Sequence, residues 1–83
     1  MKAKRTLVSR KGLEARLMAE LRKLKGCQAV QVGGITPLAR PDKSGCNWSD
    51  TFIVLWNSPL AAAEIKANLP RITREARARF NLA

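Results

Sequence analysis

One segment, residues 47–57 (NWSDTFIVLWN), limits the possible folds of this chain more than any other. It combines β-branched and aromatic residues, which favour strands, and it lies between Gly45 and Ser58-Pro59. Side chains in a strand alternate between two faces, which places Ile53 and Leu55 together on one face. The opposite face then carries Trp48, Phe52, Val54 and Trp56. Because both faces are apolar, this strand needs cover on both sides.

An amphipathic helix is predicted ahead of this strand. Leucines recur every three or four positions from Leu13 to Leu24 and form one apolar stripe. Ser9 is a suitable N-cap, and Gly26 is a suitable residue just past the end of the helix. Residues 1–11 are highly charged and show no apolar period, so we expect them to form a flexible basic arm.

A first strand is predicted over residues 27–36, with a bulge or bend at Gly33-Gly34. Residues 37–45 are rich in turn formers and are too long for a tight hairpin turn, so we expect a long loop. A continuation of the first strand, or a short extra strand, can begin near Ile35.

A second helix is predicted from Ser58, the expected N-cap, with Pro59 in the first turn. Pro70 predicts a bend that curves this helix around the core, and a split into two helices near Asn68 is the alternative. The apolar positions fall in one narrow sector of the helical wheel: Ala62, Ile65, Leu69, Ile72, Ala76 and Phe80.

These elements predict an α+β fold, a small two-layer sandwich in the order α-β-(β)-β-α. Two helices would pack on an antiparallel sheet of two or three strands, and residues 12–83 would form a single domain. Helices on one face leave the other face of the sheet bare, and an exposed apolar sheet face is typical of an interface. We therefore expect a homodimer formed through the sheet.

The charge of the chain indicates an anionic partner. Sixteen basic residues against six acidic ones give a formal net charge of +10, and residues 27–58 are neutral overall, so the excess lies at the two ends of the chain. The favoured hypothesis is a nucleic-acid-binding protein that uses its N-terminal arm and its arginine-rich C-terminal helix. A solvated surface that only keeps the protein soluble is the alternative. The candidate contact residues are Lys2, Lys4, Arg5, Arg10, Lys11, Arg71, Arg74 and Arg77.

Three aromatic residues on one strand face, Trp48, Phe52 and Trp56, form a possible interface. Such a row can stack unpaired bases, or it can form the seam of a dimer. Burial beneath the two helices is the alternative, and it is the usual fate of aromatic residues in a small domain.

Catalytic and metal-binding signatures are absent from the sequence. The chain has no histidine, and Cys27 and Cys46 are too few for a zinc site of their own. Asp42 and Asp50 flank the long loop and are interpreted as turn residues rather than as a catalytic pair. We therefore expect a non-enzymatic protein without a cofactor. A protein-interaction module that uses the apolar sheet face is the alternative function.

Localisation is inferred from the apolar pattern. The basic start is followed by too short an apolar run for a secretion signal, and no run is long enough to span a membrane. The sequence therefore predicts a cytoplasmic protein that is not bound to a membrane.

Overall fold

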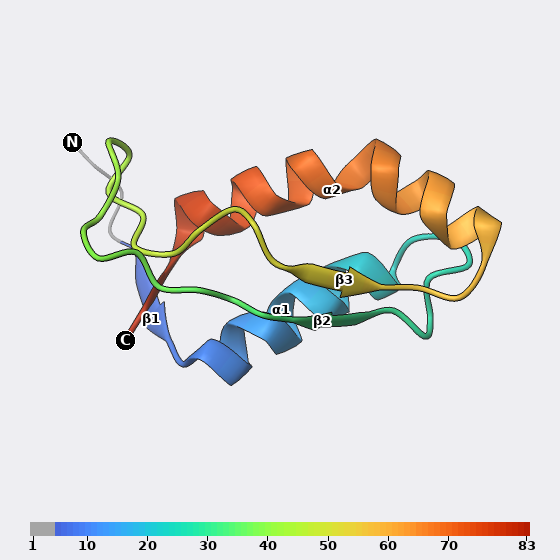
Figure 1. Cartoon of the computed structure of the whole chain (residues 1–83), viewed down its shortest axis with the longest axis horizontal. Coiled ribbons are helices and arrows are strands. Elements are labelled where there is room, and N and C mark those ends of the chain that lie inside the picture. Colours follow the sequence, from blue (N-terminus) through green and yellow to red (C-terminus); the bar gives the residue numbers. More distant parts are fainter. Residues whose placement is uncertain (1–4) are drawn as a thin grey trace.

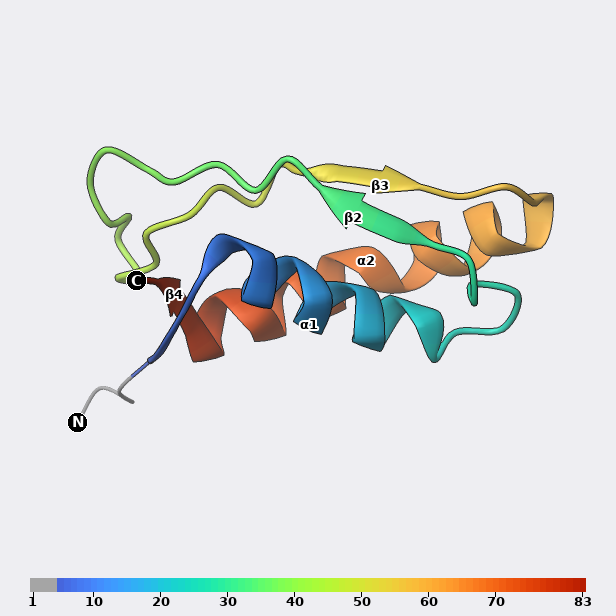
Figure 2. The same cartoon turned by 90° about the horizontal axis from the view of Figure 1, so that it is seen from below.

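A computed structural model of the chain describes residues 5–83, which form an α+β structure with two helices and two small sheets. Figures 1 and 2 show α1 and α2 packed side by side, with the ribbon of β2 and β3 on one side of the pair. The elements in chain order are β1 (Thr6–Val8), α1 (Arg10–Arg22), β2 (Gln31–Gly33), β3 (Ile53–Leu55), α2 (Pro59–Arg79) and β4 (Phe80–Leu82).

Helix α1 begins where the sequence predicts. The Ser9 hydroxyl accepts a hydrogen bond from the Gly12 amide at 3.0 Å, which satisfies one free donor of the first turn. The leucine stripe of α1 is buried against the rest of the core. The helix ends at Arg22, before the predicted stop at Gly26. The following residues make tight turns instead, and Gly26 adopts a left-handed conformation with φ 78°.

Helix α2 also follows the prediction closely. Ser58 caps it by accepting a hydrogen bond from the Ala61 amide at 3.1 Å, and Pro59 occupies the first turn. The helix continues without interruption through Pro70, so the alternative split near Asn68 does not occur. Ile65 and Ile72 on its apolar face are buried, whereas Pro70 is exposed. Proline has no N–H to donate to the backbone carbonyl one turn earlier, and on the exposed side of the helix that carbonyl is not left unpaired in the core.

Strands β2 and β3 pair in the predicted antiparallel sense, with Val32 opposite Val54. Both strands are three residues long and therefore much shorter than the predicted segments 27–36 and 47–57. The pairing continues beyond them as an isolated bridge between Pro37 and Trp48. The Ser49 amide still donates to the Thr36 carbonyl at 2.9 Å, and the pairing then lapses over residues 50–52. There the Ser49 hydroxyl accepts a hydrogen bond from the Thr51 amide at 3.1 Å, so a side chain replaces the partner strand.

A second sheet was not predicted from the sequence. Strand β1 pairs with β4 in parallel, with Leu7 opposite Asn81, and the Ala83 amide donates to the Val8 carbonyl at 2.9 Å. The backbone leaves the helical conformation at Phe80 (φ −129°, ψ 144°), which turns the last residues of the chain alongside the first strand. The element order is therefore β-α-β-β-α-β rather than α-β-(β)-β-α, and one of the two sheets is parallel rather than antiparallel.

This pairing also changes the account of the predicted arm over residues 1–11. Thr6–Val8 form β1, and Arg10 and Lys11 are the first two residues of α1. The first part of the predicted arm, residues 1–4, lies outside the described residues.

The core lies between the two helices and the inner face of the ribbon. Trp48 is its largest fully buried side chain, and Phe52 and Val54 pack against the same cluster. On the outer face of the ribbon, Ile53 and Leu55 are 57% and 60% exposed. The predicted alternation between two faces is therefore confirmed over residues 52–55, but the expected cover on both faces is not found within the described chain.

Candidate functional site

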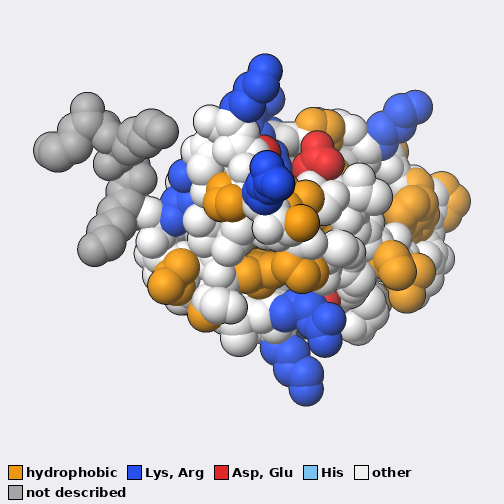
Figure 3. All heavy atoms as spheres, turned by 60° about the vertical axis from the view of Figure 1, so that its left-hand side comes forward, with side chains coloured by type: hydrophobic (Ala, Val, Ile, Leu, Met, Phe, Trp, Pro, Cys, Tyr) orange, Lys and Arg blue, Asp and Glu red, His pale blue; other side chains and the backbone are white. Residues whose placement is uncertain are grey.

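One end of the molecule brings together most of the segments that carry the predicted contact residues. The start of α1, the end of α2, the β1–β4 sheet and the turn of the β2–β3 loop all lie at this end, on the left of Figure 1. Figure 3 looks at it and shows basic side chains spread over it, with acidic side chains at fewer places. We call this region the basic end, and its residues are Arg5, Arg10, Lys11, Arg40, Lys43 and Arg74.

The loop at the basic end is closed by one carboxylate. Asp42 Oδ1 accepts hydrogen bonds from the Ser44 amide at 2.9 Å, the Ser44 hydroxyl at 2.6 Å and the Cys46 amide at 3.2 Å. Asp42 Oδ2 accepts from the guanidinium of Arg77 on α2. The Ser44 hydroxyl first, and the Arg77 guanidinium second, hold the pKa of Asp42 well below its usual range. Asp42 is therefore an ionised turn residue that fixes the loop.

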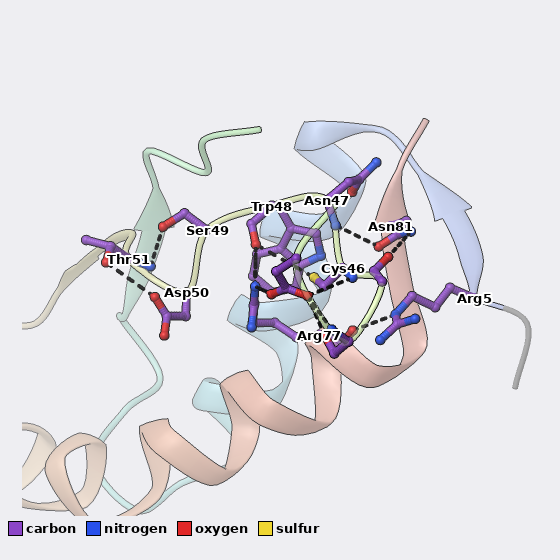
Figure 4. Close-up of polar contacts among 12 residues, drawn as sticks. Arg5, Cys46, Asn47, Trp48, Ser49, Asp50, Thr51, Arg77 and Asn81 are labelled. Carbon is purple, nitrogen blue, oxygen red and sulfur yellow. Dashed lines mark hydrogen bonds and ion pairs between the residues drawn. The ribbon is translucent and has the colours of Figure 1, made fainter. Parts of the chain in front are cut away.

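Arg77 anchors this loop to α2 at a second point. Its Nε and Nη2 donate to the carbonyl of Trp48 at 3.2 and 3.0 Å, and its guanidinium lies 5.8 Å from the centre of the Trp48 ring (Figure 4). The backbone carbonyl of Arg77 in turn accepts a hydrogen bond from Arg5 Nε at 2.8 Å. The Arg77 side chain therefore has a structural role, because it joins α2 to the β2–β3 loop.

Two asparagines join the same loop to β4. Asn47 Nδ2 donates to the Leu82 carbonyl at 2.9 Å, and the Leu82 amide donates back to Asn47 Oδ1 at 2.7 Å. Asn81 makes the matching pair of bonds with the Asn47 amide, at 3.1 Å, and the Gly45 carbonyl, at 3.0 Å (Figure 4). These side chains act as a ladder that places the loop beside β4.

A cleft of about 620 Å³ opens between this loop and α2. Three arginines line it, namely Arg5 beside β1 and Arg74 and Arg77 on α2, together with one carboxylate, Asp50. Leu69 and Pro70 on α2 add an apolar wall. The cleft therefore has an excess of positive charge beside an apolar surface.

The three arginines of the cleft differ in how far their N–H groups are used. Arg77 is engaged by Asp42 and Trp48, and Arg5 uses its Nε for the Arg77 carbonyl. Within residues 5–83, Arg74 has neither a hydrogen-bond partner nor a carboxylate partner, and it is exposed. Arg74 and the outer nitrogens of Arg5 are thus the donors that a ligand in the cleft can reach.

The remaining predicted contact residues fall into three groups. Arg10 and Lys11 are exposed in the first turn of α1. Arg71 lies on α2 and pairs with Glu75 at 3.6 Å, where both side chains face solvent. Lys2 and Lys4 lie outside the described residues. The three arginines of the predicted row on α2 therefore differ in role. Arg71 pairs with Glu75 on the same helix, Arg74 is available, and Arg77 fixes the β2–β3 loop.

The predicted aromatic row does not form a common surface. Trp48 is fully buried and donates from its indole Nε1 to the Phe80 carbonyl at 3.0 Å. Phe52 packs against it with ring centres 6.4 Å apart, and only Trp56 of the three is exposed, at 49%. The pairing of the ribbon lapses between Trp48 and Phe52, so the strict alternation does not hold over the whole row. The alternative, burial beneath the helices, is correct for Trp48.

Neither cysteine offers a reactive site. Cys27 and Cys46 are free thiols in the core, and burial raises the pKa of Cys27. Among residues 5–83, no group of three or more cysteine, aspartate or glutamate side chains is placed to hold a metal ion. In the same part of the chain, no helix is long and apolar enough to cross a membrane.

Comparison of the chain with protein-family models, with curated proteins and with solved structures finds no match.

Proposed function

We propose that this protein binds nucleic acid without catalysing a reaction, and that the basic end contacts the phosphate backbone. The observation that carries the proposal is an unbalanced charge on converging segments. Within residues 5–83, ion pairs join Lys23 to Glu20, Arg71 to Glu75 and Arg77 to Asp42, and most of the basic side chains have no carboxylate partner. Unpaired cations on neighbouring segments suit a phosphate backbone and supply affinity without sequence specificity.

The structure changes which residues carry this proposal. Arg77 leaves the predicted contact set because its side chain is engaged by Asp42 and Trp48. Arg40 and Lys43 enter it because the loop that carries them turns at the basic end. Both are exposed. The contact surface is then formed by the start of α1, the turn of the loop and one face of α2.

Salt dependence tests the proposal. Fluorescence anisotropy titrations of single- and double-stranded DNA and RNA, at about 50 and 200 mM salt, should show affinity falling steeply with salt. The variant Lys11→Gln/Lys43→Gln should lower the slope of log K against log salt by about two, since each phosphate contact adds about one. Lys25→Gln/Lys66→Gln is the matched control, because these lysines are also exposed but lie on segments away from the basic end.

Two results would contradict the proposal. One is the absence of binding to any of the four nucleic acids at low salt. The other is an equal loss of binding in the two double variants, which would mean that net charge matters and the basic end does not.

A second function, a protein-interaction module, is favoured by one specific observation. Ile53 and Leu55 are more than half exposed on the outer face of the ribbon, and large apolar side chains grouped in this way are typical of an interface. The expected partner is a second copy of the chain, since this part of the sequence is uncharged overall and two copies can approach there despite their high net charge.

Sedimentation velocity tests this alternative. Ile53→Lys/Leu55→Lys should convert a dimer to a monomer, whereas Leu7→Lys, at a residue that is 66% exposed on β1, should leave the dimer intact. A wild-type protein that stays monomeric at high concentration would rule the dimer out.

A further inference from the structure

The cleft beside α2 is larger than a backbone phosphate needs. Its volume of about 620 Å³ falls within the range of about 300–1,000 Å³ that is usual for small-molecule sites. A surface that only neutralises a passing phosphate backbone needs separate cations rather than a cleft of this size. The shape therefore indicates a ligand with an organic part as well as a charge.

The donors of the cleft suit a phosphate group. Arg74 is available, and Arg5 presents its outer nitrogens while its Nε is held by the Arg77 carbonyl at 2.8 Å. An arginine whose orientation is already fixed loses less conformational entropy on binding, and the planar guanidinium matches two phosphate oxygens at once. Arg77 also lines the cleft and adds positive potential, but its guanidinium is already engaged by Asp42 and Trp48.

The other walls suit a nucleoside. Leu69 and Pro70 supply an apolar surface on which one face of a base can lie. Asp50, exposed at the rim, can accept hydrogen bonds from sugar hydroxyls or a base amino group, whereas it repels a bare dianion. A carboxylate beside arginines thus favours a ligand that has both donors and a phosphate over inorganic phosphate alone.

We infer that this cleft binds one nucleotide with a terminal phosphate, the phosphate between Arg5 and Arg74 and the base against Leu69 and Pro70. The inference deepens the proposed function and rests on it where the nucleotide is the 5′ end of a strand. A free nucleoside monophosphate presents the same chemistry, and the experiment separates these two sources.

The experiment compares two single-stranded oligonucleotides of one sequence, with a 5′-phosphate and with a 5′-hydroxyl, binding to the full chain. The phosphorylated strand should bind about tenfold more tightly, since charge-assisted bonds from arginine to phosphate are worth at least about that factor. Arg74→Gln should abolish the difference, and it should weaken binding of the 5′-hydroxyl strand no more than Lys43→Gln, which also removes one cation of the basic end. Arg71→Gln is the matched control on the same helix, because Arg71 does not line the cleft.

Calorimetric titration with adenosine 5′-monophosphate, adenosine and inorganic phosphate identifies the source. Binding of the monophosphate but not of adenosine, lost in Arg74→Gln, assigns the cleft to free nucleotides. A 5′-phosphate effect on the strand without binding of the monophosphate assigns it to strand ends. Inorganic phosphate that binds as tightly as the monophosphate would refute the nucleoside part of the site.

The two proposals can fail separately. Equal affinity for both strands with a steep salt dependence, and no binding of the monophosphate, would contradict nucleotide binding in the cleft. The proposal that the basic end binds the phosphate backbone would still stand. Binding of the monophosphate alone, without any binding of nucleic acid at low salt, would contradict the proposed function but support nucleotide binding in the cleft.

Discussion

Arg77 on α2 and Asp42 in the β2–β3 loop form an ion pair that joins positions 35 residues apart. The same carboxylate closes the turn of the loop through Ser44 and Cys46, and the same guanidinium holds the Trp48 carbonyl. One contact thus sets both the shape of the loop and its position on the helix. The cleft between loop and helix exists because this pair fixes one side of it.

The hydrogen bonds that Asp42 accepts, first from the Ser44 hydroxyl and second from Arg77, predict a loss of stability in acid. The pKa of Asp42 is depressed in the folded protein, so its contribution is fully present above the unfolded pKa of about 4 and is lost as the pH falls below that value. Asp42→Asn should be less stable than wild type at pH 7 and should lose less stability between pH 4 and pH 2. Urea unfolding across this range measures both effects. Asp50→Asn is the control, and a wild-type pH profile in Asp42→Asn would contradict the assignment.

Arg77 and Arg74 should differ sharply when each is replaced. Arg77→Ala leaves the Trp48 carbonyl with only the weak thiol donor of Cys46, at 3.6 Å, which costs about 1–3 kcal/mol, or several degrees in melting temperature. Arg74→Ala removes an exposed side chain without a described partner, and its effect should stay within about 0.5 kcal/mol. Thermal unfolding by circular dichroism compares the two. Equal stability of the two variants would mean that Arg77 has no structural role.

The features of the fold that depend on nearby residues were predictable from the sequence. The caps at Ser9 and Ser58, the leucine stripe of α1 and the continuous helix through Pro70 were all predicted, because each depends on residues within about one turn. The β1–β4 sheet was missed because three-residue strands at opposite ends of the chain carry no periodic signal. The break in the predicted strand over residues 50–52 has a local cause, the Ser49 hydroxyl that accepts the Thr51 amide in place of a ladder bond.

The candidate site was predicted only in part. Charge alone singled out Arg5 and Arg74, but nothing separated Arg74 from Arg77, since both are helical arginines one turn apart in the sequence. Their difference comes from a carboxylate and a carbonyl supplied by the distant loop. Asn47 and Asn81 were missed for the same reason, because their partners lie 34 to 36 positions away. A polar residue shortly after the turn glycine Gly45 was the only available signal for Asn47.

The two tryptophans should report separately on the core and the surface. Trp56→Phe leaves only the buried Trp48, so its emission should be blue-shifted and poorly quenched by iodide. Trp48→Phe leaves the half-exposed Trp56, whose emission should be quenched more strongly. This second variant should also be less stable by about 1–3 kcal/mol, because the Phe80 carbonyl loses its indole donor. Equal quenching of the two variants would contradict the burial of Trp48.

Gly26 tests the turn after α1, and Gly33 in β2 is its matched control. Gly26 has φ 78°, and a Cβ placed on it would lie 2.8 Å from Leu60 Cδ2, so Gly26→Ala combines backbone strain with a side-chain overlap. We expect a loss of about 1–3 kcal/mol in the free energy of unfolding. Gly33 has no atom within 4 Å of such a Cβ and does not have a positive φ, so Gly33→Ala should be neutral or stabilising by up to about 1 kcal/mol.

A double variant separates the two causes at Gly26. Leu60 is 47% exposed, so Leu60→Ala alone should cost little, while in Gly26→Ala/Leu60→Ala it removes the overlap. Because the left-handed backbone remains, the double variant should recover only part of the stability that Gly26→Ala loses. Urea unfolding of all four variants measures this coupling. Full recovery would assign the whole effect to Leu60, and a Gly26→Ala protein as stable as Gly33→Ala would show that the turn is not built as described.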